Sequence, residues 1–221
     1  MEPPLTAIDV RVLGSLIEKS LTTPEYYPLT LNSLVAACNQ KSNRDPVMQL
    51  EDTVVIRTLD AMRDRKLVWS VAEAGSRAPK YRHSILDVLK LTPLQLAVLC
   101  ELMLRGQQTA SELRLRAARM APVVDTAEVE AVLKSLVDWP EGPLVHRLPC
   151  QAGQRGERYA HSLAGEVQTD AAAVESPAEP ARIIVVGENG RIAALETRVA
   201  ALEADLASLR TQLAGFMQQF K

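Results

Sequence analysis

The sequence has few aromatic residues, no long apolar run and no leader-like beginning. Phe, Trp and Tyr make up 4% of its 221 residues, so we do not expect a stacking platform for single-stranded nucleic acid. No apolar stretch reaches the length of a membrane-spanning helix, and the first residues, MEPPLTAIDV, lack the basic and apolar regions of a signal peptide. These absences predict a cytoplasmic protein without membrane contact.

Neither sign of charge is in large excess, and cysteine is scarce. The chain has 25 basic and 27 acidic side chains, so no overall positive field draws it to nucleic acid. Its three cysteines are widely spaced and odd in number, which favours reduced thiols in a cytoplasm over a disulfide framework. An apolar share of 47% supports hydrophobic cores made of aliphatic side chains.

Signatures of catalysis and of metal binding are also missing. The sequence contains no GxSxG, no HExxH and no P-loop. His146, Cys150 and His161 are the only potential metal ligands expected near one another, and they lack the paired spacing of a zinc site. We therefore predict no catalytic residue, no metal and no cofactor, which means a protein that is not an enzyme.

The chain does contain an internal repeat. LTAIDVRVLGSLIEK (5–19) is similar to LTPLQLAVLCELMLR (91–105), and KYRHS (80–84) is similar to RYAHS (158–162). Similar blocks in the same order indicate duplication of a unit of about 75 to 80 residues. The Tyr and His of the KYRHS and RYAHS blocks share one face of a strand. Because they recur, we expect Tyr rings packed on helices and His bonded to nearby backbone rather than ligand contacts.

Each repeat has the pattern of three helices followed by a two-stranded hairpin. Thr6, Thr30 and Thr92 are expected helix caps. The apolar spacing predicts helices near 7–20, 30–38, 52–65, 93–105, 109–120 and 125–138, and strands near 67–71, 80–84, 144–149 and 157–162. This order is typical of the winged-helix variant of the helix-turn-helix. We predict a mainly α fold with small β-hairpins, as tandem winged-helix domains over 1–88 and 89–165.

The last part of the chain has a different composition. Residues 166–190 are rich in Ala, Pro and Glu, which is typical of a linker. Over 191–221 the apolar residues alternate spacings of three and four, which predicts a parallel, homodimeric coiled coil. Its core positions are Ile192, Leu195, Val199, Leu202, Leu206, Leu209, Leu213, Phe216 and Phe220. The alternative is an amphipathic helix that packs on its own chain.

The stretch NQKSNRDP (39–46) separates the second and third predicted helices. We expect Asp45 and Pro46 to start the third helix as its N-cap and first residue, and Asn39 and Asn43 to cap backbone groups. Lys41 and Arg44 would then face outward. Glu18 and Lys19, at the end of the first helix, are expected to form a solvated turn.

Basic residues suggest where nucleic acid would be contacted. The predicted third helix of the second repeat is acidic, with four carboxylates against one lysine, so phosphate would repel it. In the first repeat the basic residues of the third helix lie at its far end. The better candidates for phosphate contacts with double-stranded DNA lie in the loop and first hairpin: Lys41, Arg44, Arg77, Lys80 and Arg82. The alternative is a solvated basic face.

One long block and three shorter ones resemble a known family. VLGSLIEKSLTTPEYYPLTLNSLVAACNQKSNRDPVMQL, PKYRHS, LTPLQLAVLCELMLRG and GERYAHSLAGE are similar to the signature of the YceH or UPF0502 family of bacterial proteins, also named DUF480. The resemblance covers residues 5–166 and implies a tandem winged-helix architecture, without an established reaction or ligand.

The sequence therefore predicts a non-enzymatic tandem winged-helix protein that dimerises through its tail and binds nucleic acid weakly, as a regulator-like protein. The alternative function is that of a protein–protein adaptor, since winged-helix surfaces also serve as scaffolds and the pI is about 6.0. That alternative rests on analogy of fold.

Overall fold

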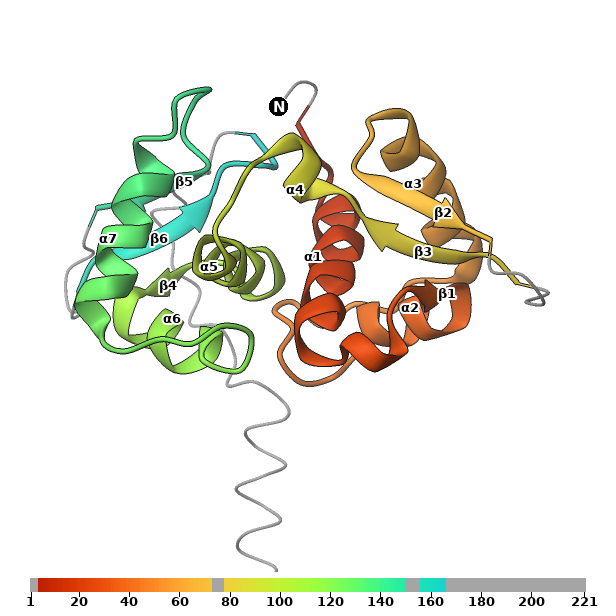
Figure 1. Ribbon diagram of the computed structural model, residues 1–221, viewed down its shortest axis with the longest axis horizontal. Helices are drawn as coiled ribbons and strands as arrows, with labels where there is room; N and C mark the ends of the chain where they lie inside the picture. Colours follow the sequence, from red (N-terminus) through yellow and green to blue (C-terminus); the bar gives the residue numbers. More distant parts are fainter. Residues whose placement is uncertain (1–3, 73–77, 150–155, 166–221) are drawn as a thin grey trace, which may run out of the picture. The chain divides into compact units, whose positions relative to one another are not determined.

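A computed structural model describes residues 4–72, 78–149 and 156–165 (Figure 1). These residues form α-helices and two small antiparallel sheets, which confirms a mixed fold dominated by helices. All of them belong to one compact unit, Met1–Ala172. The predictions for Arg77, for the linker 166–190 and for the coiled coil 191–221 lie outside the described residues.

The first half of this unit contains three main helices and one sheet. Its elements are α1 (Ala7–Thr22), the 3-10 turn η1 (Pro24–Tyr26), β1 (Leu29–Thr30), α2 (Leu31–Cys38), α3 (Asp52–Asp64), β2 (Val68–Val71) and β3 (Lys80–His83). The strands are ordered β1-β3-β2, and both pairs are antiparallel. A single helical turn, α4 (Ile85–Val88), then leads into the second half.

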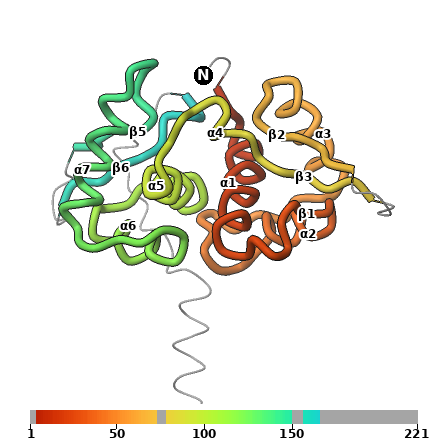
Figure 2. The backbone as a smooth tube through the Cα atoms, viewed as in Figure 1, coloured from red at the N-terminus to blue at the C-terminus, as the bar shows by residue number. Residues whose placement is uncertain are grey.

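The second half repeats this plan. It consists of α5 (Pro93–Arg105), β4 (Gln108–Thr109), α6 (Ala110–Ala117), α7 (Thr126–Val137), β5 (Val145–Leu148) and β6 (Arg158–His161). Its strand order, β4-β6-β5, matches that of the first half. The tube in Figure 2 shows the two halves of the unit. Each half contains one three-stranded sheet. The predicted helices and hairpin strands are confirmed to within a few residues, while β1, β4 and α4 were not predicted.

Side-chain caps fix where the two central helices begin. The Thr6 hydroxyl accepts from the Asp9 amide at 3.1 Å, and the Asp9 carboxylate accepts from the Thr6 amide at 2.8 Å. Thr92 and Gln95 make the same reciprocal pair at the start of α5. Such capping boxes satisfy amides that have no partner inside the helix. The predicted caps at Thr6, Thr30 and Thr92 are confirmed.

The core forms where α1 and α5 pack against each other (Figure 1). Residues Val10–Glu18 of α1 and Leu96–Leu104 of α5 are all buried, as expected for helices enclosed by other elements. Gly14 lets the helices approach closely, and the Cys100 thiol donates to its carbonyl at 3.3 Å. Cys38 and Cys100 are fully buried, as is usual for cysteines that serve as small core residues. Burial raises the pKa of both thiols.

Candidate functional site

The loop between α2 and α3 is held to the core by arginines. The Arg44 guanidinium donates to the Ala37 carbonyl at 2.8 and 3.1 Å and to its neighbour Asn43 at 2.8 Å. Arg11, on α1, donates to the Cys38 carbonyl at 3.2 Å and to the Pro46 carbonyl at 2.6 Å. The last carbonyls of a helix have no hydrogen-bond donor within the helix. For α2, the two arginines donate the missing hydrogen bonds.

Arg44 is fully buried, so the prediction that it faces outward toward phosphate is wrong. Its Nη2 lies 2.5 Å from Glu18 Oε2, and its Nη1 donates to Oε1 at 3.2 Å. Glu18 has a relative exposure of 1%, so the expected solvated turn at this residue is wrong as well. A two-pronged guanidinium–carboxylate pair is the arrangement in which two charges can share a buried site.

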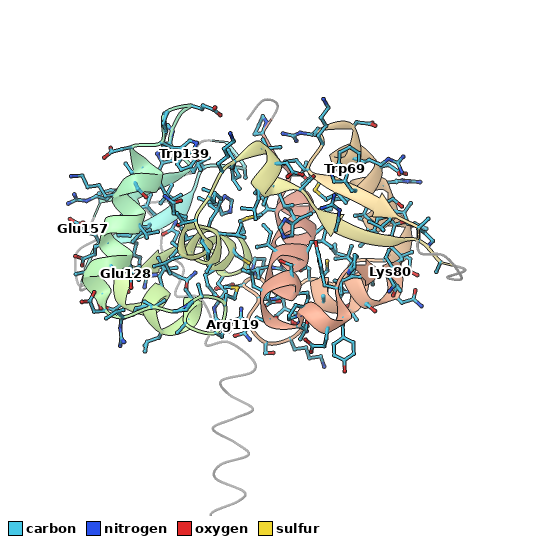
Figure 3. All side chains as sticks on the ribbon, in the orientation of Figure 1. Trp69, Lys80, Arg119, Glu128, Trp139 and Glu157 are labelled. Atoms are coloured by element: carbon cyan, nitrogen blue, oxygen red, sulfur yellow. The ribbon has the colours of Figure 1, made fainter. Side chains whose placement is uncertain are left out.

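The same carboxylate connects the two halves. Arg119, which follows α6, lies 2.7 Å from Glu18 and 2.7 Å from Glu101 of α5. Burial acts to raise the pKa of Glu18, but hydrogen bonds and charge from Arg44 and Arg119 outweigh it, so this pKa lies below its ordinary value. Figure 3 labels Arg119 at the lower centre of the molecule, near the junction of the halves. We call Glu18, Arg44, Glu101 and Arg119 the ion network.

The rest of the loop also differs from its prediction. The helix that follows begins at Asp52 with Glu51 as N-cap, so Asp45 and Pro46 do not start it. Instead, the Asp45 amide donates to the Leu104 carbonyl of α5 at 2.9 Å. Asn39 binds both backbone groups of Leu50, at 2.7 and 2.8 Å, which confirms it as a capping residue.

Asn43 does not cap backbone as predicted. Its side-chain oxygen accepts from Arg105 of α5 at 2.9 Å. Lys41, by contrast, is exposed, as predicted. The loop is therefore mainly a structural connection between the halves, and of its two basic side chains only Lys41 faces solvent.

The first hairpin presents its basic residues on one face. Trp69 is paired directly with Arg82, and Val71 with Lys80, so these four side chains share a face. On the opposite face Val68 is buried, and His83 lies 2.9 Å from the Ser20 hydroxyl of α1. Arg82 is exposed and Lys80 half-buried. We call Trp69, Val71, Lys80 and Arg82 the outer hairpin face; Trp69 and Lys80 are labelled in Figure 3.

The loop and the hairpin both bond to the last part of α1, at Glu18 and at Ser20 respectively, but their other partners differ. The loop is bonded to α1 and to the end of α5. The hairpin is bonded to Ser20, to Tyr27 and to β1. Five residues were predicted to contact phosphate. Lys80 and Arg82 are brought together, Lys41 lies in the loop, Arg44 is buried and Arg77 is outside the described residues.

The tyrosines and histidines of the repeated blocks are packing residues. Tyr81 and Tyr159 are half-buried against the core, which confirms the predicted role of their rings. Burial lowers the pKa of His83 to about 4, helped by the charge of Arg82, and lowers that of His161 to about 4. The ring of His83 bonds the hydroxyl of Ser20, so the expectation of a backbone partner for this ring is wrong.

The third helices of the two halves differ in exposed charge. On α7 and at its ends, Asp125, Glu128, Glu130 and Asp138 are exposed, together with one basic residue, Lys134. On α3, exposed Arg57 and Arg63 stand beside exposed acidic residues, and Arg63 pairs with Asp60 at 3.2 Å. Neither helix offers a predominantly basic surface.

Within the described ranges, no group of three His, Cys, Asp or Glu side chains is placed to hold a metal ion. No described helix is both long enough and apolar enough to cross a bilayer. One shallow pocket of about 300 Å³ lies beside α4 and the turn that follows α7, lined by Val88, Trp139 and Leu163 among others. It contains one carboxylate, Glu141, and no basic side chain.

Comparison with known proteins decides the family. The model of the family described as "Protein of unknown function, DUF480" matches residues 5–154. This chain belongs to the DUF480 family. A UPF0502 protein of Geobacter sulfurreducens is 54% identical over 196 residues, which are 89% of either chain. One from Vibrio parahaemolyticus is 44% identical over 200 residues, covering 89% of this chain and 90% of the relative.

These matches are longer than the resemblance noticed in the sequence. A span of 196 residues cannot fit within 5–166, so similarity to UPF0502 proteins continues into the segment predicted to be a linker. The prediction of the family is confirmed, and its extent was underestimated.

Proposed function

We propose that this DUF480 protein is a non-enzymatic, tandem winged-helix protein that binds nucleic acid weakly, as a regulator-like protein, and dimerises through a coiled coil over 191–221. The observation that carries the proposal is the outer hairpin face, on which Lys80 and Arg82 stand side by side. Two of its four side chains are basic and none is acidic, so the face attracts phosphate.

The order of elements supports the winged-helix part of the proposal. Each half has helices followed by a hairpin, and a short strand before the second helix completes a three-stranded sheet. In helix-turn-helix proteins a helix and its flanking segments share the contacts with DNA, and backbone contacts set the position. With balanced charge on α3, the hairpin and Lys41 supply those contacts, which fits weak binding.

The test is anisotropy of a labelled duplex titrated with the full chain at several salt concentrations. In the variant Lys41→Gln/Lys80→Gln/Arg82→Gln, binding should weaken and the slope of log affinity against log salt should flatten by about one for each lost phosphate contact. Arg44 is left in place because it is buried. A matched control, Lys90→Gln/Lys134→Gln/Arg147→Gln, removes the same charge from exposed residues elsewhere and should bind like the wild type.

The proposal fails if the wild type does not bind duplex or single strands at low salt, or if both triple variants lose affinity equally. Equal losses would mean that overall charge, rather than the outer hairpin face, governs binding.

A second candidate function, that of a protein–protein adaptor, is favoured by α7. Its exposed acidic residues form a surface that repels phosphate and fits a basic protein partner. The variant Glu130→Gln/Asp138→Asn separates the two functions. An adaptor would lose a co-purifying protein partner in this variant and keep it in the Lys41/Lys80/Arg82 variant. A nucleic-acid-binding protein would lose its nucleic acid in the Lys41/Lys80/Arg82 variant and keep it in the Glu130/Asp138 variant.

A further inference from the structure

Trp69 is a large aromatic side chain that the core does not use. It is 42% exposed, and it belongs neither to the buried core nor to the half-buried residues that pack on it, whereas Trp139, Tyr81 and Tyr159 do pack there. An exposed indole that contributes little to core packing suggests a binding contact, because aromatic rings are favoured anchors in binding surfaces.

The internal repeat supplies a comparison inside the same chain. The pair Trp69–Arg82 of the first hairpin corresponds in register to His146–Ala160 of the second, and Val71–Lys80 to Leu148–Arg158. In the second hairpin Ala160 and Leu148 are buried, with relative exposures of 6% and 8%. The scaffold therefore does not require an exposed aromatic–basic pair at this place, and only the first hairpin has one.

The chemistry of the outer hairpin face selects its partner. A base can stack on the indole, and the phosphates next to it can pair with Arg82 and Lys80. In a duplex each base is already stacked between neighbours, so a ring on a sheet surface reaches only unpaired bases. The low aromatic content excludes a platform of several rings, but one ring suffices for one base.

We propose that the outer hairpin face binds single-stranded nucleic acid, with one base stacked on Trp69 and the adjoining phosphates held by Arg82 and Lys80. The inference rests on the proposed nucleic-acid function and narrows it to unpaired strands. Because every base has a π-face and every strand has phosphates, both DNA and RNA present this chemistry.

The experiment measures anisotropy of labelled oligodeoxythymidylate, labelled oligouridylate and a labelled DNA duplex, titrated with the full chain at low salt. The single strands should bind more tightly than the duplex. Trp69→Leu, which keeps an apolar side chain without a π-system, should weaken single-strand binding about 5- to 150-fold, the range for one stacked base, and leave duplex binding unchanged. Trp69→Phe should retain most of the affinity.

Tyr26→Leu is the matched control, because Tyr26 is 73% exposed in the first half but lies outside the outer hairpin face; it should bind like the wild type. Thermal unfolding followed by circular dichroism verifies that Trp69→Leu folds. Loss of affinity in Trp69→Leu for either the DNA or the RNA strand supports the inference, and the strand affected identifies the sugar preferred.

Two results overturn the inference in distinguishable ways. Duplex binding with no preference for single strands, or a preference that Trp69→Leu does not reduce, refutes base stacking and leaves the proposed function standing. Absence of binding to all three probes refutes both.

Discussion

Glu18 is a carboxylate enclosed by protein and held between two guanidinium groups. Its partners Arg44 and Arg119 come from different halves of the compact unit. Removing two charges from water costs several kcal/mol, and that cost is repaid only by good geometry and complete hydrogen bonding. The network thus fixes the position of the loop and of the residues after α6 relative to α1.

Arg44→Met should lower the free energy of unfolding by about 3 kcal/mol, because it removes the two-pronged partner of Glu18 and leaves only Arg119 and the more distant Lys19 beside that carboxylate. It also leaves the carbonyls of Ala37 and Asn43 without their donor. Urea unfolding measures this. In a double-mutant cycle with Glu18→Gln, the combined loss should be smaller than the sum of the single losses. Lys41→Met changes an exposed residue of the same loop, so its free energy of unfolding should stay within about 0.5 kcal/mol of the wild type. A loss in Lys41→Met as large as that in Arg44→Met would contradict the stabilising role assigned to the buried Arg44–Glu18 pair.

The buried histidines make stability depend on pH. The pKa values of His83 and His161 are about 4 in the folded protein and 6.5 ordinarily, so between these values the unfolded chain binds more protons. Stability is then complete above pH 6.5 and is lost as pH falls toward 4, by up to about 1.4 kcal/mol per pH unit for each histidine. Unfolding by urea across this window measures the slope, and His161→Gln should remove about half of it. A slope unaltered by this substitution would exclude His161 as a source.

The sequence carries different amounts of information about these residues. Exposure of Lys41 and Arg82 was predictable, because a charged side chain without a partner remains in solvent. Burial of Arg44 was not, because its partner Glu18 is 26 positions away and hydropathy does not reveal which charges will pair. The exposure of Trp69 was not predictable either, because a low number of aromatic residues does not reveal where the few rings lie.

At the scale of elements, local signals determined what could be predicted. Helix starts followed from threonine caps and helix lengths from apolar spacing, so α1, α2 and α5 agree closely with expectation. The strands β1 and β4 have two residues each, too few for any periodicity. They exist because Tyr81 and Tyr159, on distant strands, provide backbone partners for Leu29 and Gln108.

The crossing of α1 and α5 depends on a glycine. A Cβ at Gly14 would lie 3.0 Å from Leu104 Cδ2 and 3.4 Å from Met103 Cβ, and both neighbours are buried. Gly14→Ala should therefore destabilise by about 1 kcal/mol, since overpacking of about 1–3 kcal/mol exceeds the gain in helix propensity. Chemical unfolding measures the change. Adding Leu104→Val to Gly14→Ala should recover part of the lost stability, because it makes room for the new methyl group. If Gly14→Ala alone stabilised the protein, α1 and α5 would be able to move apart without an energetic penalty.

At the scale of the whole chain, the duplicated halves share one core. Cys100 bonds the backbone of Gly14, Asp45 that of Leu104, and Arg119 joins Glu18 to Glu101. Because these contacts link both sequence repeats within one compact unit, the repeats are better described as halves of one body than as independent domains. The outer hairpin face then has a fixed orientation on that body, and one copy offers one such face.

A dimer would place two outer hairpin faces on one particle, so a tail that dimerises the chain would strengthen binding to nucleic acid. Its apolar positions over 191–221 keep a strict alternation of three and four. In the proposed parallel dimer, the flanking charges would pair between chains as Arg191 with Glu196, Arg198 with Glu203 and Asp205 with Arg210. Light scattering should give twice the mass of 24.2 kDa, and deletion of 191–221 should give a monomer.

Leu206→Lys should dissociate the dimer, because it places a charge in the apolar interface of the coiled coil, whereas Glu196→Gln, at the edge of that interface, should not. An unchanged mass after the deletion would instead favour a tail packed on its own chain. If the dimer holds, the deletion should also weaken binding to long single strands by more than binding to short ones, because only a long strand can engage both faces at once.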